Sequence, residues 1–267
     1  MDPKQRYKSK INGDQIDVAL ERALPGGEID LSLSDKQYFE FLDNTDFTNP
    51  VAQAGVGGMH GSVAYALDRW KLLSGTVSWS SNGLTLNGAI RQIREFAIGF
   101  PVVPSIEMHS GTATITYDDS TKCCDITSAG GVIKRPHLGL RAITDWAKMP
   151  KPDRDLTLLK CRKYYKTVGI GCIGVWQGTD RAFFSCAFDV QMRTEPVLYL
   201  ISSDVTLHTL GVGDVISTSA ALTGLTHTTV SGIDYVAVSG FSGGIDKAVC
   251  VPGDNVFALI ADIEEGA

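Results

Sequence analysis

Many short segments rich in Val, Ile, Thr and aromatic residues, separated by glycines and asparagines, limit the fold of this chain more than any other feature. β-Branched and aromatic residues favour strands, and Asn-Gly supplies the tight turns that join antiparallel strands. Asn-Gly occurs at 82–83 and at 87–88. The first group of predicted strands comprises residues 64–73, 76–79, 83–86, 89–96, 105–108, 112–117, 122–127 and 138–146. Strands at this spacing predict a jelly-roll-like β-sandwich over residues 43–150.

Residues 151–267 predict one connecting helix followed by a C-terminal antiparallel β domain. Asp155 is a suitable N-cap for a helix that runs to about residue 167, with Leu158, Cys161 and Tyr165 on one face. The strands that follow are expected at residues 170–176, 181–188, 197–202, 215–219, 228–231, 235–239 and 256–261. The predicted fold class is therefore mainly β.

Residues 1–42 predict a short N-terminal helix and a linker. Asn12 is a suitable N-cap, and Pro-Gly-Gly at 25–27 ends the helix. Four apolar residues share one face: Ile16, Ala19, Leu20 and Ala23. Because so short a helix is marginal alone, its apolar stripe needs a partner. The helix either packs on its own domain or, as we favour, serves attachment and oligomerisation.

Charge and hydropathy exclude some classes of function. The net charge of −6 disfavours a nucleic-acid-binding surface. No apolar run approaches the ~20 residues that a membrane helix requires, and the polar N-terminus does not resemble a secretion signal. We therefore expect neither nucleic acid as a partner nor membrane insertion.

The six cysteines are predicted to be free thiols of a protein that folds in a reducing cytoplasm. They form no Cys-x-x-Cys motif and have no histidine at metal-ligand spacing. The cysteines are Cys123, Cys124, Cys161, Cys172, Cys186 and Cys250.

Two short motifs resemble parts of bacteriophage tail-fibre and head-fibre proteins. Residues 43–70 contain Asp-Asn-x-Asp-Phe and Asn-Pro-Val-x-Gln, followed by Tyr-x-Leu-Asp-Arg-Trp, and resemble the start of their carbohydrate-binding-module-like domain. Cys-Arg-Lys-Tyr-Tyr at 161–165 resembles the Cys-Gln-Arg-Tyr-Tyr segment that follows such modules, with Arg162 and Lys163 as departures. Looser similarities are Trp-Ala-Lys at 146–148 and Met-Arg-x-x-Pro at 192–196. The similarity also favours a strand over a helix at 89–98, where the apolar spacing allows both.

The resemblance implies a phage virion fibre protein that is made in the bacterial host cytoplasm and displayed on the virion surface. Its expected partners are other virion proteins of tail or capsid, two further copies in a homotrimer, and host-surface polysaccharide. The alternative is a purely structural head-decoration or tail-assembly protein without a ligand.

Carbohydrate binding requires aromatic faces for stacking and polar side chains for hydroxyl groups. The predicted ligand-binding residues are Trp79, Arg69, Asp68 and Trp70. Asp43, Asn44 and Asp46 offer oxygen ligands for a structural calcium ion, but such runs usually form turns, so no cofactor is predicted.

No enzymatic activity is predicted. Gly-x-Ser-x-Gly at 240–244 matches the nucleophile elbow of serine hydrolases, but Pro252 prevents the helix that this motif requires. No histidine follows Ser242, so we expect a glycine-rich hairpin loop. No carboxylate pair stands out as the acid and base of a glycosidase.

Overall fold

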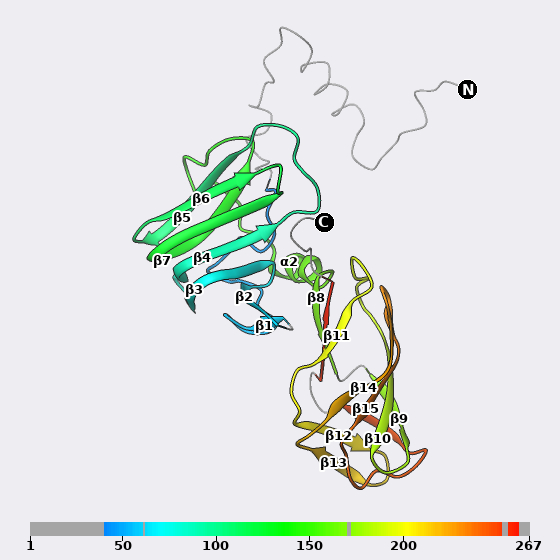
Figure 1. The fold of residues 1–267 in the computed structure, drawn as a ribbon. Helices are drawn as coiled ribbons and strands as arrows, with labels where there is room; N and C mark the ends of the chain where they lie inside the picture. Colours follow the sequence, from blue (N-terminus) through cyan, green and yellow to red (C-terminus); the bar gives the residue numbers. More distant parts are fainter. Residues whose placement is uncertain (1–39, 61, 170–171, 253–255, 262–267) are drawn as a thin grey trace, which may run out of the picture. The chain divides into compact units, whose positions relative to one another are not determined.

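The computed structural model describes residues 40–60, 62–169, 172–252 and 256–261. These residues belong to one compact unit, Glu40–Ala267. The described chain is mainly β, with antiparallel sheets and one helix, which confirms the predicted fold class (Figure 1). The predicted N-terminal helix with Ile16, Ala19, Leu20 and Ala23 lies outside the described residues. No helix among the described residues is long and apolar enough to cross a membrane.

The first β region is one seven-stranded antiparallel sheet of order β1-β2-β3-β4-β7-β5, in which β6 also pairs with β7. Its strands are β1 (Met59–His60), β2 (Val63–Leu67), β3 (Trp70–Ser80), β4 (Gly83–Ile93), β5 (Val103–Ser110), β6 (Ala113–Asp118) and β7 (Cys123–Gly139). The first part of β7 pairs with β4 and β6, and the second part pairs with β5. β5 and β6 thus follow one another along the same edge of β7.

Residues 40–58 run along this sheet and complete its core. The Phe47 N–H donates to the Lys134 carbonyl at 2.9 Å, and the Phe47 ring meets Trp70 edge-on at 5.6 Å. Phe47 and Trp70 have no exposed surface. The residues that pack with them are Leu42, Ala66, Leu67, Leu84, Leu86, Ile90, Cys124, Ile126, Ile133 and Leu138.

The two Asn-Gly pairs have different roles. Asn82 lies in the turn between β3 and β4 and Gly83 begins β4, as predicted. The prediction of a turn at 87–88 is wrong, because Gly88 lies inside β4 opposite Gly75. Both glycines have positive φ, and a Cβ on Gly88 would lie 2.1 Å from the Ser74 carbonyl oxygen. The glycine pair therefore permits a close, irregular strand approach that no larger residue allows.

Other predicted boundaries also change. The single strand expected at 64–73 is two strands joined by Asp68 and Arg69. The ambiguous segment 89–98 is strand as far as Ile93. The strand expected at 138–146 is wrong beyond Gly139, where the chain forms a loop. Arg135 stabilises that loop by donating to the Trp146 carbonyl at 2.7 Å and to the Met149 carbonyl at 3.1 Å.

The connecting helix α2 (Arg154–Cys161) is shorter than predicted. Its N-cap is Asp153, whose Oδ1 accepts hydrogen bonds from the backbone N–H groups of Asp155 and Leu156. Tyr165 does not continue the helical face, because it begins strand β8 (Tyr165–Val168) and pairs with Ile260. The long-range strand pairing overrides the local helical pattern.

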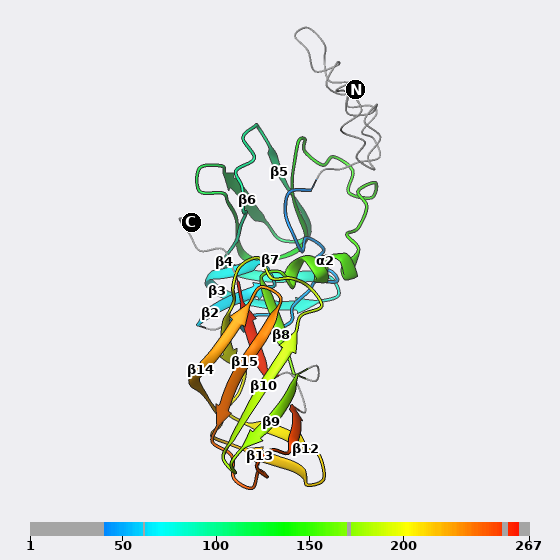
Figure 2. The ribbon, with the colours of Figure 1, turned by 90° about the vertical axis from the view of Figure 1, so that its right-hand side faces the viewer.

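The second β region contains two antiparallel sheets around one core. The larger sheet has the order β13-β12-β16-β9-β10-β15-β14, and the smaller has the order β11-β17-β8. The remaining strands are β9 (Ile173–Gln177), β10 (Arg181–Ala187), β11 (Val197–Leu200), β12 (Val205–Thr209), β13 (Gly213–Ser217), β14 (Ala221–Thr229), β15 (Gly232–Ser239), β16 (Val249–Pro252) and β17 (Phe257–Ile260). Figure 2 shows β9, β10, β15 and β14 side by side. Trp176 and Phe184 of the larger sheet pack with Phe257 and Leu259 of the smaller.

Candidate functional site

The turn between β2 and β3 places two charged side chains inside the protein. Arg69 occupies this turn with a φ of 73°, in the left-handed region that residues other than glycine rarely adopt. Asp68 is 1% exposed and Arg69 is 5% exposed. Buried charges are costly unless they are paired, so the surroundings of this turn are built from polar partners.

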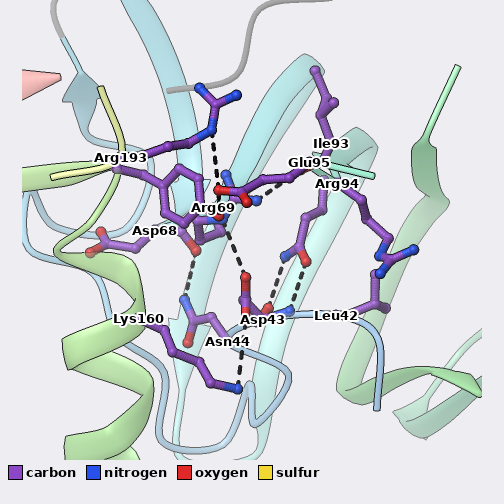
Figure 3. A network of polar contacts seen from close by, with 12 residues as sticks. Leu42, Asp43, Asn44, Asp68, Arg69, Ile93, Arg94, Glu95, Lys160 and Arg193 are labelled. Atoms are coloured by element: carbon purple, nitrogen blue, oxygen red, sulfur yellow. Dashed lines mark hydrogen bonds and ion pairs between the residues drawn. The ribbon is translucent and has the colours of Figure 1, made fainter. Parts of the chain in front are cut away.

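Arg69 joins three parts of the chain (Figure 3). Its Nη2 donates to the Ile93 carbonyl at 2.8 Å, and its Nε lies 3.5 Å from Asp43 Oδ2. Its guanidinium carbon lies 3.6 Å from the centre of the Tyr164 ring, which is cation–π geometry. Tyr164 in turn donates to Glu95 at 2.6 Å, and Glu95 pairs with Arg193 Nε at 3.1 Å.

Asp68 is held mainly by Gln53. The Gln53 backbone N–H and side-chain Nε2 donate to the two carboxylate oxygens at 2.9 and 2.7 Å. The same Nε2 group donates to the Tyr165 carbonyl at 2.8 Å. Burial raises the pKa of Asp68 above its ordinary value, and the hydrogen bonds from Gln53 partly oppose that shift.

His60 lies between two tyrosine rings. Its ring centre is 4.0 Å from that of Tyr65 and 3.6 Å from that of Tyr165, and all three rings are nearly parallel. Burial lowers the pKa of His60 to about 3, so the imidazole is neutral at pH 7. Its Nε2 lies 3.8 Å from Asp68 Oδ1, and its Nδ1 has no hydrogen-bond partner among the described residues.

The motifs at 43–70 and 161–165 meet in space. Asp68 and Arg69 come from the first motif, whereas Tyr164 and Tyr165 come from the second, almost 100 positions later in the sequence. The contacts include a hydrogen bond, a cation–π pair and stacked rings. These motifs thus have a structural role in joining the first sheet to strand β8.

A groove with a volume of about 460 Å³ opens beside this polar network. His60, Tyr65 and Ala261 are the buried part of its lining, and Tyr199 of β11 is 38% exposed. The lining also contains three charged side chains, those of Lys71, Arg193 and Glu195. The other lining residues are Ser62, Val63, Thr194, Val197 and Ile260. An aromatic ring beside hydrogen-bonding and charged side chains is suited to a polar ligand that carries C–H faces.

The four predicted ligand-binding residues lie in different environments. Asp68, Arg69 and Trp70 are buried, and the Trp70 indole donates to the Asp43 and Asn44 carbonyls. Trp79 on β3 is 46% exposed, and its indole N–H donates to the Phe47 carbonyl at 2.9 Å. The first three are thus committed to internal contacts, and a sugar-binding role for Trp79 stays a prediction.

The acidic run at 43–46 forms internal contacts. Asn44 donates to the Val51 and Asp68 carbonyls, and Asp46 accepts from the backbone and side chain of Thr48. Within the described residues, no group of three or more His, Cys, Asp or Glu side chains is arranged to hold a metal ion.

Ser242 of the Gly-x-Ser-x-Gly motif lies in the loop between β15 and β16. The residues that follow it form a turn and then β16 rather than a helix, as predicted. The loop is not the expected hairpin, because β15 pairs with β10 and β14, whereas β16 pairs with β12 and β9. The motif therefore lacks the strand–turn–helix context of a nucleophile elbow.

Sequence reasoning missed the lining of the groove. Lys71 lies more than 100 positions before Arg193 and Tyr199, so no local spacing connects it with them. Comparison with protein-family models, with curated proteins and with solved structures found no match to this chain.

Proposed function

We propose that this chain is a non-enzymatic fibre protein of a phage virion that binds host-surface glycans. The observation that carries the proposal is the groove beside His60, which combines the exposed Tyr199 ring with Lys71, Arg193 and Glu195. The partly exposed Tyr199 ring supplies an aromatic group for stacking on sugar C–H groups, and the charged and hydroxyl side chains suit sugar hydroxyls or acidic substituents. The motif resemblance supports the same class of protein.

Glycan binding is tested with the full chain on a glycan array. We expect binding, and we expect Tyr199→Ala to weaken it about tenfold, which corresponds to ~1.4 kcal/mol and is typical of removing an aromatic anchor. Tyr199→Phe keeps the ring and serves as the matched control, with affinity close to the unmodified chain. Trp79→Ala tests the other exposed aromatic residue on β3.

Three outcomes count against this assignment. No binding to any glycan, together with failure of the purified protein to block phage adsorption, contradicts the proposed function. Loss of binding in Trp79→Ala but not in Tyr199→Ala moves the site to β3. Equal loss in Tyr199→Ala and Tyr199→Phe argues against stacking in the groove.

A structural role in virion assembly is the second candidate, and an exposed apolar sheet face favours it. Val175 of β9 pairs with Val249 of β16 on one side and with Phe183 of β10 on the other. The large apolar residues that are at least 43% exposed here are Ile173, Val175, Tyr235 and Val249. Exposed apolar surface of this kind is typical of interfaces, and we propose that it is covered by other copies in a homotrimer.

Light scattering on three proteins tests the assembly. We expect a trimer for the full chain, and a trimer that survives deletion of residues 1–27. We expect Val175→Lys to give monomers, because a buried charge would oppose association. A trimer that is lost with residues 1–27 instead assigns oligomerisation to the predicted helix, and a monomeric full chain contradicts the trimeric fibre.

A further inference from the structure

Two of the six free cysteines face each other across a strand pair. The β9–β10 ladder pairs Ile173 with Ser185, so continuing its register by one residue places Cys172 opposite Cys186. The Cys186 thiol donates to the carbonyl oxygen of its own neighbour Ala187 at 3.4 Å. Directly opposite residues have Cβ atoms about 4.5–5.5 Å apart, and a disulfide requires about 3.5–4.5 Å. A small movement of the two strands towards each other is therefore sufficient for the two sulfurs to form a disulfide.

The surroundings favour a thiolate on Cys186. A hydrogen-bonding interaction with the Cys172 side chain and the charge of the Lys166 ammonium lower the pKa of Cys186 to about 7, although burial opposes them. The same interaction and burial raise the pKa of Cys172, so Cys172 keeps its proton. The other charged groups near Lys166 are Asp189, which pairs with it, and Arg162, which also pairs with Asp189.

Cys186 is reachable from solvent. It is partly exposed and lines an open depression of about 470 Å³ with residues of β10 and β15 and of the turn between β14 and β15. Asp234 lies at the same depression and pairs with His227 at 2.9 Å. By contrast Cys250, in the same sheet, is 1% exposed, and burial raises the pKa of its thiol to about 11.

We propose that Cys186 and Cys172 form a thiol–disulfide exchange site that reacts with low-molecular-weight disulfides. The Cys186 thiolate attacks one sulfur of the small disulfide, and the reagent's S–S bond breaks as one thiolate leaves. Cys172 then loses its proton, and its sulfur attacks the Cys186 sulfur and expels the second thiolate. The two cysteines are oxidised to one disulfide, and the reagent is reduced to two thiols, which take up the two protons.

Oxidised glutathione and the reduced full chain test the site, with peptide mapping by mass spectrometry. The full chain is expected to give a Cys172–Cys186 disulfide. Cys172→Ala is expected to accumulate a glutathione adduct on Cys186, because the resolving thiol is absent. Cys186→Ser is expected to give neither product. Cys250→Ser is the matched control and should behave as the unmodified chain.

Alkylation rates supply an independent readout. At pH 7 Cys186 is expected to react about threefold faster than an ordinary exposed thiol, since its larger thiolate fraction is partly offset by lower nucleophilicity. The midpoint of its pH profile should lie near 7 and rise in Lys166→Met. A stable adduct on Cys186 in the unmodified chain overturns the resolving role of Cys172. If Cys186 is alkylated no faster than Cys250, the proposed exchange site is wrong.

Discussion

Trp176→Ala is expected to lower the free energy of unfolding by about 3–5 kcal/mol, the range for removing a buried Trp or Phe side chain. Trp176 is 1% exposed, and its ring meets Phe241 edge-on at 5.3 Å. Gly244 lies so close that a Cβ there would be 2.3 Å from the indole Cε3 atom. The substitution leaves a large cavity and removes the donor to the Thr209 hydroxyl, which bonds the indole at 2.9 Å.

Urea denaturation measures this loss. Trp176→Phe keeps most of the ring but not the N–H, so its loss should be smaller than that of the alanine variant. Trp79→Ala is the exposed comparison, and we expect a smaller loss there because Trp79 is 46% exposed. A loss under about 1 kcal/mol in Trp176→Ala would contradict the described packing of the second β region.

Lowering the pH from 7 to 5 is expected to cost about 2 kcal/mol of stability through His60 alone. The pKa of His60 is about 3 in the folded protein, against an ordinary value of 6.5. The unfolded chain therefore binds a proton on His60 below pH 6.5, whereas the folded protein does not. The contribution of the neutral His60 side chain to the free energy of unfolding is therefore complete above pH 6.5, and it declines as the pH falls towards 3.

His60→Phe keeps an aromatic ring between Tyr65 and Tyr165 and removes the titration. Its stability should therefore change about 2 kcal/mol less between pH 7 and 5, measured by urea denaturation at both values. Asp68 acts in the opposite direction, because its raised folded pKa favours proton uptake by the folded protein as the pH falls. Asp68→Asn isolates that contribution, and an unchanged pH dependence in His60→Phe would contradict a buried neutral imidazole.

The strand content was predictable because segments rich in β-branched residues alternate with turn residues over most of the chain after residue 43. Where local patterns conflicted with long-range pairing, the pairing decided the structure. Tyr165 fits a helical face but pairs with Ile260, and Gly88 follows an asparagine but lies opposite Gly75 within the sheet. The local sequence around Tyr165 does not identify Ile260 as its partner, and the local sequence around Gly88 does not identify Gly75.

The surroundings of Asp68 and Arg69 show why the candidate site was harder to predict. Charged residues next to a tryptophan suggested a surface site, yet both charges are buried, with Asp43, Gln53 and Tyr164 as partners. Those partners lie at three separate places in the sequence, so no spacing rule identifies them. No spacing rule identifies the lining of the groove either, because that lining comes from strands of different sheets.

The consecutive residues Tyr164 and Tyr165 have a mechanical consequence. Tyr164 contacts Arg69 and Glu95, and Tyr165 stacks on His60 while its backbone pairs with Ile260 of β17. A pull between the two β regions would therefore load ring stacks, an ion pair and a strand ladder together, rather than extend residues 140–153 as a slack tether. Such parallel loading resists force better than bonds that break one at a time.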